Sequence, residues 1–325
     1  MGKKTILTSL IFLCLFLILF PENHSLFSQK FFTREEAACE QLEKGEIDQA
    51  INILEKELKA KPDNLNARLY LGIAFYLKRN LERASKELEK TEKDIDRMLG
   101  SSRPFGDEAM FTQLGMDRKA GLLFSEERKG LLYFFRGLTL KEKKDLKNAE
   151  KKFKKAQKSK YDKTSLSLQF IDLYLKKKDL KSATKKLNEF KKISGESQIT
   201  TFLDGYIQYK NKDLDASLAS FEKIADAEPG AKKNIGCLHY NRGEFQKAIE
   251  IWDELLSQHP EDKEVQIDLG RAYFQVGDAT KAQEYFDKAG IKIPPSRYSP
   301  KQIPLIYETV LKEVKLDLQC IAKKK

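Results

Sequence analysis

Residues 269–294 read LGRAYFQVGDATKAQEYFDKAGIKIP, and this stretch decides the fold of the chain. Gly270 is followed twelve residues later by Ala282, four residues further by Phe286, and eight residues further by Pro294. A small residue allows two helices to approach closely, and proline cannot continue a helix. The spacing therefore predicts two antiparallel helices joined by a short turn.

The same register recurs along most of the chain. Gly72, Gly137 and Gly205 repeat it, each followed by Ala or Ser after twelve residues and by Leu or Phe four residues later. A period of about 34 residues is typical of solenoids, in which each helix pair buries its apolar face against its neighbours. We count seven units, of which the fourth has Ile171 at the glycine position.

This pattern resembles the tetratricopeptide repeat family over roughly residues 31–296. The resemblance implies an all-α fold, a right-handed superhelical solenoid of about seven helix pairs. Helical spacing returns after Pro295, so we also predict a C-terminal capping helix from Pro304 to Ile321. The predicted organisation is a signal peptide or uncleaved N-terminal anchor (1–28), units one and two (31–98), an insertion (99–129), units three to seven (130–296), and the capping helix with a basic tail (297–325).

The insertion at 99–129 allows two interpretations. It opens with a turn-forming cluster from Gly100 to Gly106 and continues with scattered apolar residues. A long excursion inside a compact array is more often functional or flexible than neutral. The alternative is a pair of extended helix ends joined by a surface loop.

The first 28 residues differ in kind from the repeats. Lys3 and Lys4 precede an apolar run from Ile6 to Phe20, which is the layout of a secretory signal. At about 1.5 Å per residue this run covers roughly 22 Å, less than the about 30 Å of a bilayer hydrocarbon core. We therefore expect an exported protein, periplasmic or associated with a bacterial cell envelope, and keep retention of the segment as a membrane anchor as the alternative.

Positive charge is concentrated in units three and four. Between Lys141 and Lys192 there are 19 lysines and 7 acidic residues, a local excess of +12 against +11 for the whole chain. The inward positions of the second helices are apolar, so we expect these lysines on the convex side. Such a face is usually solvated, and the alternative is attraction to anionic lipid or an anionic envelope polymer. The predicted basic patch comprises Lys151, Lys152, Lys154, Lys155, Lys176, Lys177 and Lys178.

The resemblance also implies that the first helix of each unit lines a concave groove. Side chains one and four residues after the small residue then face the groove, and many of these are aromatic. Tyrosine offers large contact area at low entropic cost, which favours a site for a partner peptide or helix. The alternative is that the aromatic residues pack between adjacent helices. The predicted groove residues are Tyr76, Phe134, Phe202, Tyr206, Tyr209, Lys233, Tyr240, Arg271 and Phe274.

Two further positions follow from the same comparison. Asp172 occupies a groove-facing position in unit four. Lys233 and Asn234 lie where some members of the family capture a C-terminal carboxylate, but Glu264 and Asp268 bring the wrong charge for that role. We therefore do not expect a carboxylate clamp, and we assign Lys233 and Arg271 to fixing the polarity of a bound segment.

The residues expected of an enzyme are scarce. The histidines are His24, His239 and His259, and the sequence has no HExxH, paired-cysteine, phosphate-loop, GxGxxG or GxSxG motif. Cys237 and His239 are close in sequence, but two residues apart on a helix they point to different faces. We therefore predict a non-enzymatic protein with no metal site and no cofactor.

The sequence thus predicts an exported scaffold or adaptor of the bacterial cell envelope that binds a partner peptide or helix in an aromatic groove. The alternative is an envelope-surface binder that uses the basic patch on an anionic membrane or polymer. Self-association through a terminal face is a third interpretation. Nucleic acid is not an expected partner, because an export signal would remove the chain from it.

Overall fold

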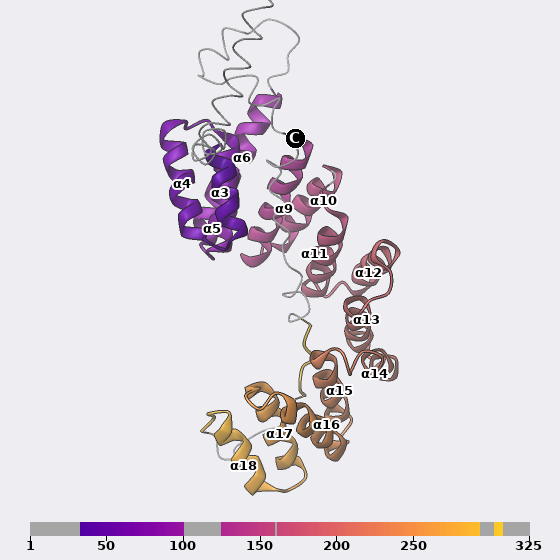
Figure 1. Cartoon of the computed structure of the whole chain (residues 1–325). Helices are drawn as coiled ribbons and strands as arrows, with labels where there is room; N and C mark the ends of the chain where they lie inside the picture. Colours follow the sequence, from indigo (N-terminus) through magenta and orange to yellow (C-terminus); the bar gives the residue numbers. More distant parts are fainter. Residues whose placement is uncertain (1–32, 101–124, 160, 293–301, 308–325) are drawn as a thin grey trace, which may run out of the picture. The chain divides into compact units, whose positions relative to one another are not determined.

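The chain is built from helix pairs in series (Figure 1). The structure, a computed structural model, describes residues 33–100, 125–159, 161–292 and 302–307, and these ranges contain fourteen α-helices and no strand. The predicted all-α class is confirmed. The predicted signal segment and the tail beyond residue 307 lie outside the described residues, as does most of the insertion.

The chain divides into two compact units, each made of several helix pairs, and the described part of unit 1 extends to Tyr161. It contains three helix pairs, and within each pair the two helices pack on one another. The first helices are the more deeply buried, since α5 buries eleven of its 13 residues and α10 buries three of 13. The helices are α3 (Arg34–Glu43), α4 (Ile47–Ala60), α5 (Leu65–Leu77), α6 (Leu81–Gly100), α9 (Glu126–Glu142) and α10 (Leu146–Lys158).

Unit 2 begins at Asp162 and contains four helix pairs. Three of its first helices, α13, α15 and α17, are buried on more than one side because each also contacts the second helix of the preceding pair. The helices are α11 (Lys163–Lys176), α12 (Leu180–Ser194), α13 (Gln198–Lys210), α14 (Leu214–Glu222), α15 (Pro229–Asn241), α16 (Phe245–Gln258), α17 (Lys263–Gln275) and α18 (Ala279–Lys288).

Glycine sets how closely the two helices of a pair approach. A Cβ at Gly270 would lie 2.7 Å from the ring of Phe286, and one at Gly72 would lie 2.6 Å from Leu88. Gly236 faces the fully buried indole of Trp252 in the same way. The sixteen-residue spacing seen in the sequence is therefore the contact between a first helix and the bulky residue of the second.

The same tight turn joins the two helices of every pair. The N–H of Asp145 donates to the carbonyl of Leu140 at 2.9 Å, which is the long hydrogen bond of a Schellman motif. Its side chain then accepts from the N–H of Asn148 and caps the next helix. One aspartate thus closes the first helix and opens the second.

The packing of helix pairs continues across the insertion. Within unit 1, Tyr76 of α5 meets Phe135 of α9 edge to face at 5.5 Å between ring centroids. Glu92 of α6 lies 3.0 Å from Arg136 of α9. α6 extends to Gly100 and α9 begins at Glu126, so both ends of the predicted insertion are helical. The insertion interrupts the sequence register, whereas α6 still packs on α9.

The predicted capping helix is wrong at its start. Residues 302–307 are not helical, although the sequence placed Pro304–Tyr307 in the first turn of that helix. Side chains of α11 and α15 bind this stretch through its backbone and its tyrosine, as described below. Residues 308–321 lie outside the described residues.

The length and hydropathy of a helix decide whether it can cross a membrane, and both are known for the described helices. None of those within residues 33–100, 125–159 and 161–292 combines the length and the hydropathy needed to cross a bilayer.

Candidate functional site

Three first helices of unit 2 hold a piece of the chain's own polypeptide. Residues 302–307, which we call the docked segment, are bound by Asp172 of α11, Tyr206 of α13, and Asn234 and Asn241 of α15. We call these four residues the docking face. They lie on the first helices of three consecutive pairs, the helices that the family resemblance assigns to a concave surface.

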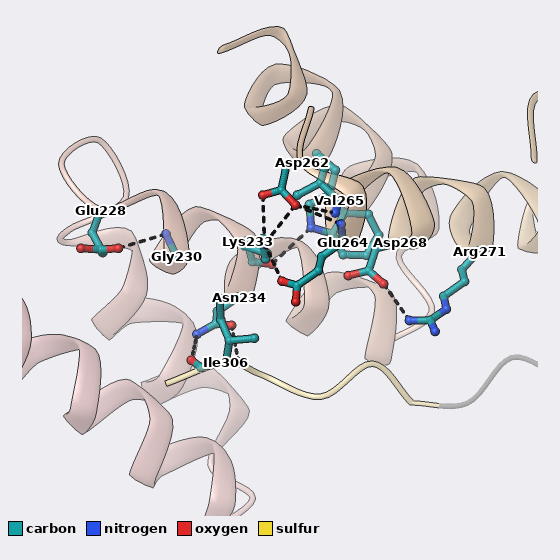
Figure 2. A network of polar contacts seen from close by, with 11 residues as sticks. Glu228, Gly230, Lys233, Asn234, Asp262, Glu264, Val265, Asp268, Arg271 and Ile306 are labelled. Atoms are coloured by element: carbon teal, nitrogen blue, oxygen red, sulfur yellow. Dashed lines mark hydrogen bonds and ion pairs between the residues drawn. The ribbon is translucent and has the colours of Figure 1, made fainter. Parts of the chain in front are cut away.

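The two asparagine side chains form hydrogen bonds with the backbone of the docked segment. Asn241 donates from Nδ2 to the carbonyl of Ile303 at 2.9 Å, and its Oδ1 accepts from the N–H of Ile303 at 3.0 Å. Asn234 makes the same pair of hydrogen bonds with Ile306, at 3.0 and 2.9 Å (Figure 2 shows this pair). Four backbone groups are thereby satisfied by two side chains.

The spacing of the asparagines matches an extended chain. Asn234 and Asn241 are seven residues apart on α15, so they lie on one face and about 10.5 Å apart along the axis. Ile303 and Ile306 are three residues apart, and three residues span at most about 10–11 Å when fully extended. The docked segment is therefore nearly extended, and it runs antiparallel to α15.

Pro229 fixes the start of the helix that carries the asparagines. It occupies the first turn of α15, where its missing N–H is not needed. The preceding Glu228 accepts from the N–H of Gly230 at 3.1 Å. In the next helix, the indole of Trp252 donates to the carbonyl of Lys233 at 3.2 Å. α15 is thus fixed directly beside Asn234.

Tyr307 occupies the other end of the docking face. Its hydroxyl donates to Oδ1 of Asp172 at 3.2 Å, and its ring lies 4.4 Å from that of Tyr206 between centroids. The second oxygen of Asp172 accepts from Lys176 at 3.2 Å. Lys210 lies over the ring of Tyr206 at 5.1 Å. The tyrosine is therefore recognised through both its ring and its hydroxyl.

The docked segment buries alternate side chains. Ile303, Leu305 and Tyr307 are 2%, 4% and 6% exposed, whereas Gln302 and Pro304 face solvent. Full burial of such a side chain stabilises a contact by roughly 1.5–3 kcal/mol. The segment is therefore bound by apolar burial as well as by hydrogen bonds.

The structure distributes the predicted aromatic residues over different environments. Tyr206 contacts the docked segment. Phe134 and Phe202 are fully buried and pack against Phe153 and Phe221 of their own helix pairs. The other predicted aromatics are buried beside further rings or half-buried: Tyr76 against Phe135, Tyr240 against Phe245 and Trp252, Tyr209 under Lys210, and Phe274 half-buried in α17.

The two predicted polarity residues bind carboxylates of α17 and its N-cap. Lys233 lies 3.0 Å from Asp262 and 3.0 Å from Glu264, and Arg271 lies 2.7 Å from Asp268 (Figure 2). Burial disfavours the charged lysine, but the hydrogen bonds that Lys233 donates to Glu264 and Asp262 and the charges of these carboxylates outweigh it and raise the pKa of Lys233. The Lys233 contacts connect α15 to α17 and its N-cap beside Asn234, whereas the Arg271–Asp268 pair lies within α17.

Cys237 has the environment of a structural thiol. It is 2% exposed, and burial, reinforced by the nearby charge of Asp268, raises its pKa well above the usual value. The thiolate is the nucleophilic form of cysteine, so this group is unreactive. His239 contacts Glu244 through Nδ1 at 2.9 Å.

The predicted basic patch is divided between the two units. Lys151, Lys152, Lys154 and Lys155 belong to α10 of unit 1, whereas Lys176, Lys177 and Lys178 belong to the end of α11 and the turn after it in unit 2. Several already have anionic partners. Lys152 and Lys155 contact Glu92, Lys154 contacts Glu150, and Lys176 contacts Asp172.

Sequence reasoning gave Asn241 and residues 302–307 no role at this site. The available signal was two asparagines separated by two helical turns, since such a pair presents two amides to one line of backbone. The alternation of Ile303, Leu305 and Tyr307 was a second signal, because a period of two indicates an extended segment.

The fold and the docking face together define an α-helical repeat protein that holds an extended polypeptide. Residues 36–96 and 240–299 each match a model of the tetratricopeptide repeat family. The chain is a tetratricopeptide repeat protein.

Solved structures with the same fold have little sequence in common with this chain. A tetratricopeptide repeat protein from Parabacteroides merdae superposes with a TM-score of 0.58 at 12% identity, covering 86% of this chain and 96% of that one. The Cut9–Hcn1 hetero-tetramer of APC/C gives a TM-score of 0.54 at 12% identity, covering 86% of this chain and 50% of that one. These similarities concern the fold alone.

One curated relative matches over a short region. Outer dynein arm-docking complex subunit 4 of Xenopus laevis is 29% identical over 90 residues, which is 27% of this chain and 17% of that protein. The match therefore covers only a small part of that protein.

Proposed function

We propose that this chain is a protein interaction adaptor that holds an extended segment of a partner protein on the docking face of unit 2. The observation that carries the proposal is the asparagine pair, which exchanges four hydrogen bonds with the backbone of residues 303 and 306. Backbone contacts of this kind supply affinity for an extended peptide, and side-chain positions between them supply specificity. The function is therefore binding, without a chemical step.

The proposal is tested with a labelled peptide that copies residues 299–310. The protein is the full chain carrying Leu305→Asp and Tyr307→Ala, which we call the released variant because both changes weaken the docked segment. We expect this variant to bind the peptide, as measured by fluorescence anisotropy. Adding Asn234→Ala and Asn241→Ala removes four hydrogen bonds of about 0.5–1.5 kcal/mol each, so binding should weaken by at least about 30-fold.

The matched control is Asn188→Ala. Asn188 is an exposed asparagine within α12 of the same unit, away from the docking face residues. Its replacement should leave peptide affinity unchanged. Equal peptide binding with and without the asparagine pair would exclude the docking face as the binding site.

We propose further that the adaptor acts outside the cytoplasm, in a bacterial cell envelope. The support is the sequence of residues 1–28, with two lysines before an apolar run. Cell fractionation should place the protein with the envelope, and mass spectrometry of its N-terminus should show whether cleavage follows Ser28 or the segment is retained. Recovery of the full chain from the cytoplasm alone would contradict export.

The alternative function, binding of an anionic membrane or polymer through the basic patch, has less support. Lys152 and Lys176 form ion pairs with Glu92 and Asp172, so part of the positive charge is neutralised within the protein. Binding to anionic vesicles would fade between 0.1 and 1 M salt, where the Debye length falls from about 10 to about 3 Å, whereas peptide binding through buried apolar side chains would persist. Salt dependence therefore separates the two functions.

A further inference from the structure

We infer that residues 302–307 are a built-in competitor that closes the docking face, and that the partner which opens it carries the same five-residue pattern as Ile303–Tyr307. This inference rests on the proposed function and adds two things to it, the sequence class of the partner and the regulation of the site.

The backbone contacts restrict the first and fourth positions of the pattern. The N–H groups of Ile303 and Ile306 donate to Asn241 and Asn234, so proline, which has no N–H, cannot occupy either position. The second position is Pro304, whose side chain is exposed. Proline is therefore accepted at the second position and excluded at the first and fourth.

The side chains restrict the first, third and fifth positions. Ile303 and Leu305 are almost fully buried, so the first and third positions require apolar residues. At the fifth position, Asp172 presents a carboxylate oxygen to the hydroxyl of Tyr307, and an ionised carboxylate only accepts hydrogen bonds. Phenylalanine would keep the ring contact with Tyr206 but would lose the hydrogen bond to Asp172.

The partner is therefore a protein with an extended segment that is apolar at positions one and three and ends in tyrosine. Proline is excluded from positions one and four of this segment. A partner with an acidic fifth residue is disfavoured, because Asp172 would face a like charge.

Covalent connection makes the docked segment a strong competitor. It belongs to the same chain as its binding site, and a tethered ligand acts at an effective concentration on the order of 1 mM. A free peptide with the same micromolar intrinsic affinity, added at a much lower concentration, would then displace only a small fraction of the docked segment. The wild-type chain should therefore bind the peptide at least about 10-fold more weakly than the released variant does.

The experiment adds wild-type protein and a peptide series to the test described above. The labelled peptide of residues 299–310 is titrated with wild-type chain, with the released variant, and with the released variant carrying Asn234→Ala and Asn241→Ala. Peptides carrying Ile306→Pro, Leu305→Asp or Tyr307→Phe are titrated against the released variant, with Pro304→Ala as the matched control. We expect tight binding of the original and Pro304→Ala peptides, weaker binding of Tyr307→Phe, and loss of binding for the other two.

The outcomes separate the inference from the function. Equal affinity of wild-type chain and released variant would overturn the built-in competition while leaving the docking face as a binding site. Unimpaired binding of the Ile306→Pro peptide would overturn the proposed pattern. Failure of every protein to bind any peptide, with circular dichroism showing native helicity, would overturn the proposed function as well.

A second copy of the chain is the other source of the same segment. If the docked segment were exchanged between copies, wild-type chain would form a dimer that the released variant does not form. Light scattering across a concentration series measures this directly. A monomer supports the intramolecular competitor, and a dimer that dissociates in the released variant would overturn it.

Discussion

Glu92 gathers three cationic side chains in unit 1. Arg136 lies at 3.0 Å, Lys152 at 2.5 Å and Lys155 at 2.9 Å from its carboxylate, which is 6% exposed. Burial alone would raise the pKa of Glu92, but the hydrogen bonds from Lys152 and Lys155 and the charge of Arg136 outweigh it and hold the pKa below its usual value. The cluster joins α6, α9 and α10 beside the insertion.

Glu92→Gln should destabilise unit 1 by about 3–5 kcal/mol, because removing one member of a buried ionic cluster leaves the others uncompensated. Urea unfolding measures the loss. The matched control is Glu89→Gln, which removes a more exposed pair with Lys93 in the same helix and should cost about 1 kcal/mol or less. Equal effects of the two substitutions would contradict the structural role assigned to Glu92.

Asp268 gives unit 2 a specific pH dependence. Burial raises the pKa of Asp268 from 3.8 to about 6, against the favourable charge of Arg271. The folded protein therefore holds this proton more tightly than the unfolded chain, so the contribution of Asp268 to stability falls as the pH rises from about 4 to about 6. The loss amounts to about 3 kcal/mol.

Asp268→Asn should remove that contribution, since asparagine is neutral at every pH and still offers an oxygen to Arg271. The free energy of unfolding at pH 4.5 and at pH 7.5 should differ less in the variant than in the wild-type chain. A pH profile parallel to that of the wild type would show that Asp268 is ionised throughout this range.

At the scale of elements, the turn inside each helix pair places one residue in the left-handed backbone conformation. This conformation is sterically unfavourable for every residue except glycine. Lys212 and Lys178 have φ values of 68° and 60°, in the left-handed region, where Gly277 and Gly243 have 85° and 80°. The left-handed conformation costs a residue with a Cβ roughly 1–2 kcal/mol. The repeats with lysine at this position are therefore less favourable at the turn than those with glycine.

Lys212→Gly should raise the free energy of unfolding by about 1 kcal/mol. The reciprocal control is Gly277→Ala, which should lower it by a similar amount because alanine must enter the same conformation. Thermal or urea unfolding of both variants measures the effect. Stabilisation by both substitutions, or by neither, would show that conformation at this turn does not govern stability.

The helix pairs could be predicted from the sequence, whereas the docked segment could not. Gly270, Ala282 and Phe286 predicted a helix pair because their contact is local, within about 16 residues, and sterically strict. Residues 304–307 of the docked segment were predicted as helix because Ile306 begins an apolar series with helical spacing. The partners of the segment, Asn234 and Asn241, are 72 and 62 residues away from Ile306 and Ile303. A polar side chain on a helix does not indicate which segment, far away in the sequence, it will bind.

At the scale of unit 2, the docked segment joins parts of the chain that are far apart in sequence. Tyr307 reaches Asp172 across 135 residues, and Ile303 reaches Asn241 at the far end of the same face. The four helix pairs otherwise contact mainly their neighbours in the series. The segment therefore adds a long-range connection to an array of short-range ones.

Hydrogen exchange should detect this connection in the wild-type chain. The amides of Ile303 and Ile306 donate to asparagine side chains, so they should exchange at least about 10-fold more slowly than in the free peptide of residues 299–310. Asn234→Ala together with Asn241→Ala should abolish the protection, and Asn188→Ala should not. Exchange at the free-peptide rate in the wild-type chain would mean that the segment is not docked in solution.

The presence of site and ligand on one polypeptide has an evolutionary consequence. A substitution at Asn241 or Asp172 that weakens docking can be compensated only by a change near Ile303 or Tyr307 on the same gene. Covariation between these positions is therefore expected among homologous chains, since co-varying pairs reflect spatial contact. An external partner that binds the same face would have to covary with the docking face and with the docked segment. Substitutions in its binding segment should therefore parallel those in residues 303–307.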